Sequence, residues 1–303
     1  MIAGLVSTII PVYNRRTQLR EAVESVLAQD WRPIEVIIVD DGSSDDTFEV
    51  AQALARDNPG LVHAATQANT GPGGARERGR MLARGEYIQY LDSDDVLLPG
   101  KFSAQVGALQ ARSDCHVAYG MTRFRHTDGT RATGPWKDSG IERATMFPSF
   151  LVDRWWDTPT PLYRREICDR AGPWSDIRQE EDWEYDCRIA SLGARLAWCG
   201  QYVCEVRDHD GDRLSRGPAL APARMRQRAR SHALIFSHAR RAGIGSDVPE
   251  MQYFARALFL LARQCGAAGL PSESRELFEL ARTACGERRA RGLDYRAYQA
   301  VAR

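Results

Sequence analysis

Three carboxylates follow an apolar segment: Asp92, Asp94 and Asp95 come directly after Tyr87–Leu91. Aromatic and β-branched residues are typical of a buried strand, and ligands of open α/β sheets bind where strands end. One or two carboxylates, completed by water and substrate phosphates, form the sites that Mg²⁺ and Mn²⁺ prefer. The segment therefore indicates a metal-assisted site for a phosphorylated ligand. The structural alternative is an acidic cap on the next helix.

The flanking segments predict the elements that position these carboxylates. Buried strands are expected at 5–12 and 34–39 because both runs are apolar and β-branched, and apolar residues at helical spacing predict helices over 18–29 and 47–56. Further strands are expected at 61–66, 117–125, 130–136 and 194–206, and further helices at 75–83, 101–110, 167–171 and 180–192. Alternating strands and helices predict a largely parallel sheet of right-handed βαβ units.

Charge divides the chain into two parts. The 303 residues carry 41 Lys and Arg and 40 Asp and Glu. From Arg213 onward there are 17 Arg and 7 acidic residues, which leaves 24 basic and 33 acidic residues in the first 212. An acidic body followed by a basic, Ala- and Leu-rich segment indicates two segments with different roles. In the second, helices are expected at 222–242, 249–265 and 272–284.

Several classes of protein are excluded by what the sequence lacks. The seven cysteines form no CxxC pair and no zinc-binding spacing, which is typical of reduced, buried thiols. No apolar run has the length of a membrane span, and the first residues indicate a strand rather than a signal peptide. The glycine-rich dinucleotide motif, the P-loop and the G-x-S-x-G elbow are missing. We therefore expect a cytoplasmic protein, at most peripheral to the inner face of a membrane.

Two alternatives to the metal-assisted site remain open. Asp92–Val96 also fits the D-x-D-x-[TV] motif of haloacid-dehalogenase-like phosphohydrolases, in which Asp92 would be the nucleophile. That motif normally follows the first strand, whereas two strand–helix units precede it here. A non-catalytic binding or scaffold protein is the second alternative.

As an ordered set, the motifs resemble glycosyltransferase family 2, the inverting enzymes of the GT-A fold. The resemblance extends from about residue 3 to 216. It rests on the segments Ile9–Asn14, Ile38–Asp45, Asn69–Gly79, Ala83–Asp95, Glu181–Asp182 and His209–Arg216. It implies an α/β GT-A catalytic domain over 1–216, Rossmann-like with a mostly parallel central sheet. Residues 217–303 would then form a C-terminal α-helical extension.

The resemblance also assigns the donor and metal sites. Asp41, rather than Asp40, would accept from the imide of a uracil-like base, and Arg76 would contact the diphosphate with its forked donors. Asp94 would be the direct ligand of Mn²⁺ or Mg²⁺, with Asp92 and His209 as further metal ligands. The complete nucleotide-binding set is Pro11, Val12, Tyr13, Asn14, Asp40, Asp41, Gly71, Arg76, Asp92 and Ser93. Helix capping by Asp40 or Asp41 and a solvated Arg76 are the structural alternatives.

The remaining site residues concern the acceptor. An inverting transfer needs a base for the acceptor hydroxyl. Asp182 is the predicted base, with Glu181 as the second choice, and the neighbouring Trp183 would raise its proton affinity. The alternative is an acidic helix N-terminus. The expected acceptor-binding residues are Trp155, Trp156, Thr158, Thr160 and Trp183, although Trp is also common in protein cores.

The sequence therefore predicts a metal-dependent inverting glycosyltransferase. Its donor would be a nucleotide diphosphate sugar, with a UDP-sugar as the preferred expectation. Its acceptor would be a hydroxyl of a glycan or of a lipid-linked precursor in cell-envelope polysaccharide biosynthesis. No nucleic-acid partner is expected. Arg213–Arg241 contains eight Arg and no acidic residue. Packing on the acidic body or in a homodimer is the preferred explanation, and contact with an anionic membrane is the alternative.

Overall fold

The computed structural model describes residues 1–208, 220–290, 292, 295 and 298 of the chain. It separates into two compact units. Unit 1 comprises residues 1–144, 155–176 and 194–211, and unit 2 comprises 145–154, 177–193 and 212–303. Both ranges include residues outside the described part.

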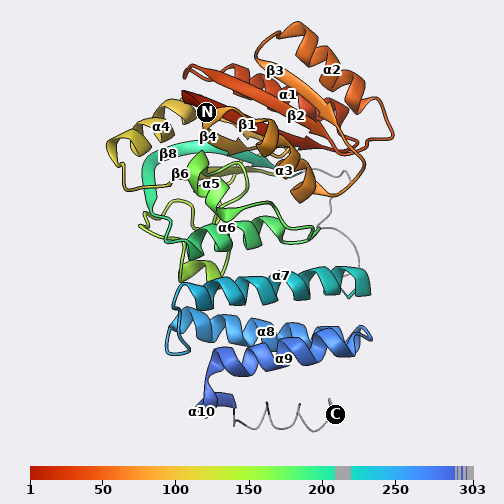
Figure 1. Cartoon of the computed structure of the whole chain (residues 1–303), viewed down its shortest axis with the longest axis vertical. Helices are drawn as coiled ribbons and strands as arrows, with labels where there is room; N and C mark the ends of the chain where they lie inside the picture. Colours follow the sequence, from red (N-terminus) through yellow and green to blue (C-terminus); the bar gives the residue numbers. More distant parts are fainter. Residues whose placement is uncertain (209–219, 291, 293–294, 296–297, 299–303) are drawn as a thin grey trace. The chain divides into compact units, whose positions relative to one another are not determined.

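Unit 1 is built on a mixed sheet of eight strands with the order β3-β2-β1-β4-β7-β6-β8-β5 (Figure 1). Four strands are mutually parallel: β1 (Ile2–Val12), β2 (Ile34–Asp40), β3 (Val62–Thr66) and β4 (Gly85–Tyr90). The others are β5 (Val96–Leu97), β6 (Val117–Arg125), β7 (Leu162–Arg164) and β8 (Leu196–Arg207). β7 is antiparallel to both β4 and β6, whereas β6 and β8 are parallel.

Helices cover both faces of this sheet. They are α1 (Arg16–Leu27), α2 (Thr47–Asp57), α3 (Pro72–Leu82), α4 (Lys101–Ala111) and α5 (Arg165–Ala171). α1, α2 and α4 share one apolar cluster with Val6, Ile10 and Ile38 of the central strands. α3 lies on the opposite face, where a Cβ atom on Gly79 would come within 2.3 Å of Ile9. Neighbouring strand residues point to opposite faces, so both faces of β1 are apolar.

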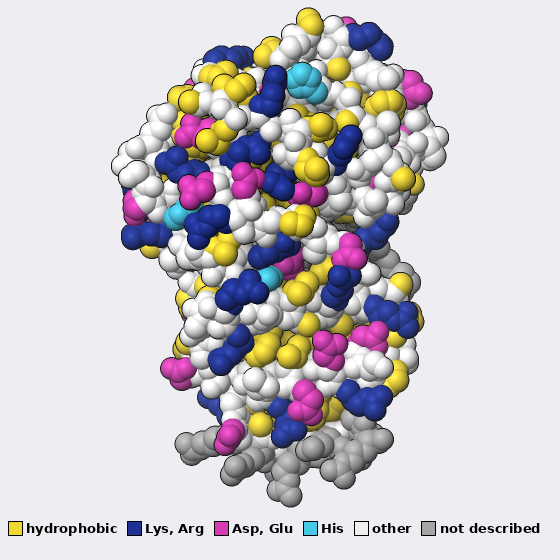
Figure 2. Space-filling view, viewed as in Figure 1, with side chains coloured by type: hydrophobic (Ala, Val, Ile, Leu, Met, Phe, Trp, Pro, Cys, Tyr) yellow, Lys and Arg dark blue, Asp and Glu magenta, His cyan; other side chains and the backbone are white. Residues whose placement is uncertain are grey.

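Unit 2 is helical. It contains the short 3₁₀ helix η1 (Ser149–Leu151) and the helices α6 (Glu181–Ser191), α7 (Pro222–Arg241), α8 (Pro249–Ala267), α9 (Pro271–Cys285) and α10 (Glu287–Ala290). α7 packs against α6. Lys and Arg side chains are scattered over the visible face of the molecule rather than gathered into one patch (Figure 2).

The basic helix α7 finds acidic partners within unit 2. Arg228 Nε donates to Glu180 at 2.9 Å, and the two ring nitrogens His232 Nδ1 and His238 Nε2 lie 3.1 and 2.8 Å from Glu180 and Glu184. Part of the positive charge of the C-terminal segment is therefore neutralised by α6. Among the described residues, no helix is long and apolar enough to cross a membrane.

The structure confirms the predicted α/β class with C-terminal helices and corrects some elements. Thr130–Trp136 is not a strand: it makes one bridge, Arg125 with Arg131, before Gly134 and Pro135 interrupt the pairing. The short strands β5 and β7 were not predicted, because two or three residues give no periodicity. The expected domain boundary at 216/217 lies outside the described residues and stays a prediction. α6 clusters with the C-terminal helices.

Candidate active site

The carboxyl ends of three adjacent parallel strands define one edge of the sheet in unit 1. β1 ends at Val12, β2 at Asp40 and β4 at Tyr90, and Val12 is in register with Asp40 while Ile9 is in register with Tyr90. The loops that follow therefore begin side by side. They carry most of the residues predicted to bind the donor.

Asp41 connects two of these loops. Its Oδ1 accepts from Gln67 Nε2 and from the backbone N–H of Thr70, both at 2.9 Å, and its Oδ2 accepts from the N–H of Gly71 at 2.8 Å. Gly71 has a φ of +92°, a region that favours glycine. The buried Asp41 carboxylate therefore fixes the loop that leads into α3.

Asp40 has a different environment. Its Oδ2 accepts from Ser43 N–H at 3.2 Å and from Thr66 Oγ1 at 3.0 Å, and its buried Oδ1 has no hydrogen-bond partner in the described residues. Neither aspartate caps α2 with its side chain, since the cap position is Asp46. The capping alternative therefore does not account for this pair.

The first loop contributes one exposed ring and one anchoring amide. Tyr13 is 47% exposed, whereas Pro11 and Val12 are buried. Asn14 is bound to the second loop, because its N–H donates to Ser43 Oγ and its Oδ1 accepts from Ser44 N–H, both at 2.9 Å. Of these four residues, Tyr13 and Asn14 are exposed, and Tyr13 is the one with a ring that a ligand could stack on.

Arg76 and Asp92 form an ion pair at this edge. Arg76 Nη2 donates to Asp92 Oδ1 at 2.7 Å, and the guanidinium lies 4.8 Å from the ring centroid of Trp174. Trp174 in turn packs edge-on against Tyr90, at the end of β4, with ring centroids 5.0 Å apart. Arg76 is thus a buried, oriented cation, which excludes the solvated alternative.

The next two aspartates also meet arginines. Arg15 Nη1 lies 3.3 Å from Asp94 Oδ2, and Arg207 N–H donates to Asp95 Oδ1 at 3.0 Å. Burial, reinforced by the charges of Asp94 and Asp92, raises the pKa of Asp95 well above its ordinary value. Asp95 is therefore a structural member of the loop, whereas the side chains of Asp92 and Asp94 remain 32% and 20% exposed.

The side chains at this edge of the sheet could supply only some of the ligands of a divalent cation. No group of three or more His, Cys, Asp or Glu side chains in the described part of the chain could hold a metal ion. His209 lies outside the described residues. Two partly exposed carboxylates nevertheless match the one or two protein ligands with which Mg²⁺ binds a nucleotide, the phosphates supplying the others.

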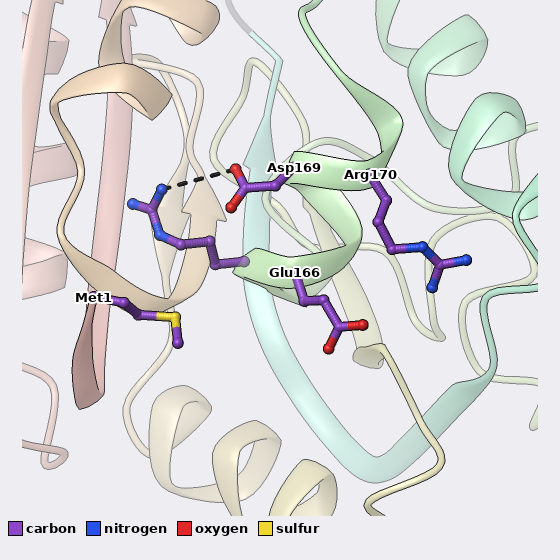
Figure 3. Close-up of a pocket in the computed structure, with 5 residues that line it drawn as sticks. Met1, Glu166, Asp169 and Arg170 are labelled. Carbon is purple, nitrogen blue, oxygen red and sulfur yellow. Dashed lines mark ion pairs between the residues drawn. The ribbon is translucent and has the colours of Figure 1, made fainter.

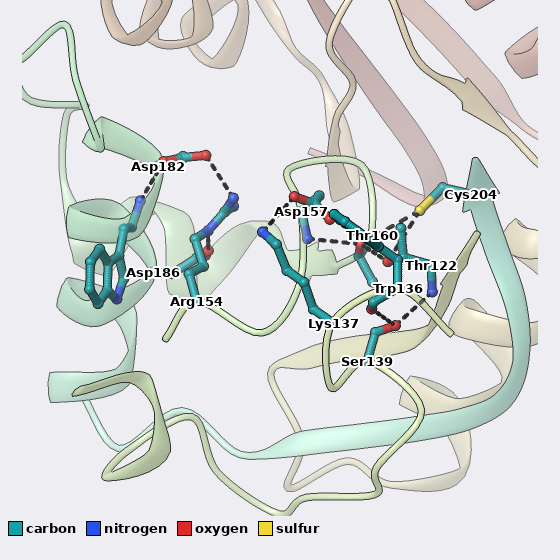
Figure 4. Close-up of polar contacts among 11 residues, drawn as sticks. Thr122, Trp136, Lys137, Ser139, Arg154, Asp157, Thr160, Asp182, Asp186 and Cys204 are labelled. Carbon is teal, nitrogen blue, oxygen red and sulfur yellow. Dashed lines mark hydrogen bonds and ion pairs between the residues drawn. The ribbon is translucent and has the colours of Figure 1, made fainter. Parts of the chain in front are cut away.

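The predicted acceptor residues of unit 1 are largely covered by protein. Trp155 and Trp156 are buried against Tyr119, with ring centroids 5.2 and 5.5 Å away. Thr158 is also buried, and Thr160 Oγ1 lies 2.7 Å from Thr122 Oγ1 within a polar cluster that includes Cys204 (Figure 4). In the described conformation these four side chains offer an acceptor almost no surface.

In unit 2 the predicted base is held by an arginine. Asp182 Oδ2 accepts from Arg154 Nη1 at 2.6 Å, and Asp182 Oδ1 accepts from the N–H of Trp183 at 2.8 Å. The Trp183 indole N–H donates to Phe150 O at 2.9 Å. Glu181 is buried. The immediate charged neighbour of Asp182 is therefore a guanidinium, and not only the apolar surroundings that the sequence predicts.

A surface hollow of about 470 Å³ lies elsewhere in unit 1. Its lining is Met1, Arg165, Glu166, Asp169 and Arg170 (Figure 3). Met1 precedes β1, so the hollow belongs to the edge of the sheet opposite to the site. We assign no role to it.

Comparison with known proteins identifies the family. The profile described as Glycosyl transferase family 2 matches residues 7–168, more than half of the chain. The chain belongs to glycosyl transferase family 2. This confirms the predicted family and class of enzyme. The match includes Asp92–Val96, and it therefore argues against the phosphohydrolase alternative.

Curated relatives share mainly this N-terminal region. An uncharacterized glycosyltransferase of Nostoc sp. is 32% identical over 179 residues, which are 57% of this chain and 55% of the relative. The GalNAc(5)-diNAcBac-PP-undecaprenol beta-1,3-glucosyltransferase of Campylobacter jejuni is 40% identical over 98 residues, 32% of each chain. The chain thus spans between about a third and about half of the length of these two relatives.

Solved structures support the fold. S. aureus TarS (residues 1–349) aligns with a TM-score of 0.66 at 17% identity, over 93% of this chain and 81% of that one. The mannosyltransferase PcManGT of Pyrobaculum calidifontis, solved with GDP-Man and Mn²⁺, aligns with a TM-score of 0.53 at 20% identity, over 98% and 83%. The glycosyl transferase family 2 chain therefore has the GT-A-like architecture that its sequence predicts.

Several residues that contact the predicted site residues through a ring or a guanidinium were not themselves predicted. Trp174, Arg154 and Arg15 are examples. Arg15 directly follows Asn14 of the first motif, so its place in the sequence could have indicated a role at the site. Trp174 and Arg154 have no such signal, because tertiary structure alone brings them to Arg76 and Asp182.

Proposed function

We propose that this protein transfers a sugar, with inversion and with the help of a divalent metal, from a nucleotide diphosphate sugar to a hydroxyl acceptor. The observation that carries the proposal is the convergence of Asp41, Arg76, Asp92 and Asp94 at the carboxyl edge of β1, β2 and β4 in a family 2 chain. Ligands of open α/β sheets bind at such an edge.

In this proposal, the base and the ribose bind against the first two loops. Tyr13 offers its exposed ring to the base, while Pro11, Val12 and Asn14 shape the loop beneath it. Asp41 Oδ2 accepts one hydrogen bond and has the capacity for a second, which the imide of uracil could donate. UDP-sugars are therefore the first donors to test. Because TarS was solved with UDP-GlcNAc and PcManGT with GDP-Man, GDP-sugars are tested next.

Charge stabilisation is assigned to Arg76 and to a metal ion at Asp94 and Asp92. Bound Mn²⁺ or Mg²⁺ would neutralise the negative charge that develops on the departing nucleoside diphosphate. Arg76 is already oriented by Trp174 and can present its forked donors to a phosphate oxygen. His209 remains a proposed third ligand.

Asp182 is the proposed base, with Glu181 as the second choice. An inverting transfer needs a carboxylate that accepts the acceptor proton as the hydroxyl attacks the anomeric carbon. The Asp182 side chain is 28% exposed and is held by Arg154, whereas Glu181 is 7% exposed. Asp182 is therefore the better placed of the two to meet an acceptor.

The proposed acceptor is a glycan or a lipid-linked precursor. The Campylobacter relative is named for an undecaprenol-linked substrate. Of the predicted acceptor residues, Trp183 keeps partial exposure, and Trp155, Trp156, Thr158 and Thr160 would take part only after a local rearrangement. Contact of the basic α7 with anionic lipid and pairing of two chains through the C-terminal helices stay proposals, as does a cytoplasmic location.

A donor-turnover screen tests the proposal. Purified protein is incubated with UDP-, GDP- and dTDP-sugars, with Mn²⁺ or with EDTA, and release of the nucleoside diphosphate into water is measured. We expect release from one nucleotide class, dependent on metal, and a fall of at least tenfold in Asp182→Asn with unchanged donor binding. Donor binding without any release, in water or with added glycan acceptors, would favour the scaffold alternative. Release that is equal in Asp182→Asn would remove the assigned base.

A further inference from the structure

Arg154 bridges two carboxylates of α6. Its Nη1 donates to Asp182 Oδ2 at 2.6 Å and its Nε donates to Asp186 Oδ2 at 2.8 Å (Figure 4). Asp182 and Asp186 are one helical turn apart and therefore lie on the same side of α6. All three residues belong to unit 2.

Burial distinguishes the two ends of this bridge. The side chain of Asp186 is 1% exposed and that of Arg154 is 9% exposed, whereas Asp182 is 28% exposed. A buried carboxylate needs a partner of opposite charge, and removing one partner of such a pair is costly. The Arg154–Asp186 pair is thus a fixed anchor, and Asp182 is the end that faces solvent.

The planar guanidinium makes the bridge directional. Two different nitrogens of one rigid plane bind two different carboxylates, so the position of Asp186 determines where Nη1 points. Lysine, a point charge on a flexible stem, cannot reproduce this geometry. The orientation of Asp182 therefore also depends on Asp186, through the guanidinium that both carboxylates share.

We infer that Arg154, anchored by Asp186, is a positioning residue that fixes the orientation and the charge of the Asp182 carboxylate. The inference rests on the proposed function, in which Asp182 accepts the proton of the acceptor hydroxyl. In this scheme Arg154 acts through Asp182 and contacts neither the donor nor the acceptor. It holds the carboxylate in one orientation before the acceptor arrives.

Other charged groups surround α6 and share its electrostatic environment. Glu180 pairs with Arg228 and His232 of α7, and Glu184 pairs with His238 of α7 and with Arg188 of α6. The charged and titratable groups to be considered around Asp182 are therefore Arg154, Glu180, Glu181, Glu184, Asp186, Arg188, Arg228, His232 and His238. Among the described ion pairs, that of Asp182 is with Arg154.

Titration of Asp182 by carbon-detected NMR tests the inference without a substrate. Protein labelled with ¹³C-aspartate is titrated, and the Asp182 signal is assigned by its loss in Asp182→Asn. Arg154→Met should move the titration midpoint of Asp182 up by about one to three pH units, because a contacting cation is lost. Asp186→Asn removes a nearby negative charge, which lowers the midpoint, and also removes the anchor of Arg154, which raises it, so the Arg154 variant carries the test.

Arg188→Met is the matched control. Arg188 forms a short ion pair with Glu184 on the same helix and does not pair with Asp182 in any contact described. It should leave the Asp182 midpoint within about 0.3 pH units. A midpoint that is unchanged in folded Arg154→Met would overturn the inference. Arg154→Gln, judged by the same midpoint, provides the test if Arg154→Met does not fold.

Turnover separates this inference from the proposed function. Arg154→Lys should lower kcat for release of the nucleoside diphosphate by at least about tenfold, with KM for the donor within about twofold, because charge is kept and orientation is lost. An unchanged kcat would contradict the positioning role. Full activity of Asp182→Asn would instead refute the base assignment, while the NMR shifts would still report whether Arg154 controls Asp182.

Discussion

The buried Lys101 should make the free energy of unfolding depend on pH by an amount that can be worked out from its surroundings. It is the first residue of α4 and is fully buried, and its Nζ donates at 2.9 Å to the carbonyl oxygens of Pro159 and Thr160. Burial lowers the pKa of Lys101 from 10.5 to about 8, although the thiols of Cys204 and Cys199 oppose the shift. The charged form is thus disfavoured in the folded protein.

The sign of the resulting pH dependence follows from proton binding. Below pH 8 both states bind the proton, and Lys101 adds no slope. Between pH 8 and 10.5 the unfolded chain binds the proton while the folded protein does not, so the free energy of unfolding rises with pH. At about 1.4 kcal/mol per pH unit, the whole window corresponds to about 3 kcal/mol.

Urea unfolding of the wild type and of Lys101→Met between pH 7 and 9 measures this contribution. The two carbonyls keep other donors in the variant, Gln89 Nε2 at 3.1 Å and Gln105 Nε2 at 2.8 Å. Thiols of the unfolded chain ionise in this range, but they do so in both proteins and cancel in the difference between them. The free energy of unfolding of the wild type should rise by about 1 kcal/mol relative to the variant over this range. A difference that is constant or falls with pH would refute the reasoning.

Four substitutions test other parts of the structure. Arg76→Lys should weaken UDP binding by at least about tenfold in calorimetry, because the forked donors are lost; equal affinity would contradict the phosphate role. Trp174→Leu should weaken the same binding by up to about tenfold through loss of the stacked cation, and an unchanged affinity would show that Arg76 is held otherwise. Asp41→Asn should lower the free energy of unfolding by about 1–3 kcal/mol and speed amide exchange in loop 67–71. Amides that stay protected from exchange would argue against the role of Asp41 in fixing this loop. Burial raises the pKa of Glu180, but His232 and Arg228 more than offset it and the net pKa is lowered. Its stabilisation is therefore lost as the pH falls below 4.5 through the folded value, and Glu180→Gln should lose less stability on acidification, as chemical unfolding at pH 5 and pH 3 will show.

The sequence predicts the parallel half of the fold well for a physical reason. Strands that are covered on both faces, such as β1 and β2, are continuous apolar runs, and the helices between them keep a 3.6-residue period. Where long-range pairing decides, the sequence fails. β5 and β7 exist only because β8, β4 and β6 supply partners, and Thr130–Trp136 has strand-forming residues but no partner beyond one bridge.

The candidate site likewise contains residues that local motifs predict and residues that only tertiary contacts reveal. Asp41, Arg76, Asp92 and Asp94 stand in motifs, so their positions at the strand ends could be predicted. The guanidinium beside Asp182 and the indole beside Arg76 come from positions 154 and 174, which no motif connects to their partners. Predicting them needs the tertiary contacts of 145–154 and 172–176. Burial of Trp155 and Trp156 likewise depends on packing against Tyr119, which composition alone does not reveal.

Calorimetric titration of UDP, GDP and dTDP, each with Mn²⁺ and with EDTA, tests the central claim most directly. We expect saturable binding of one nucleotide, with UDP as the first candidate, in the presence of the metal. That binding should be lost with EDTA and in Asp94→Ala, whose fold is checked by its unfolding transition. Absence of saturable heat for all three nucleotides, or binding that persists unchanged in Asp94→Ala, would contradict the assignment of the donor and metal site.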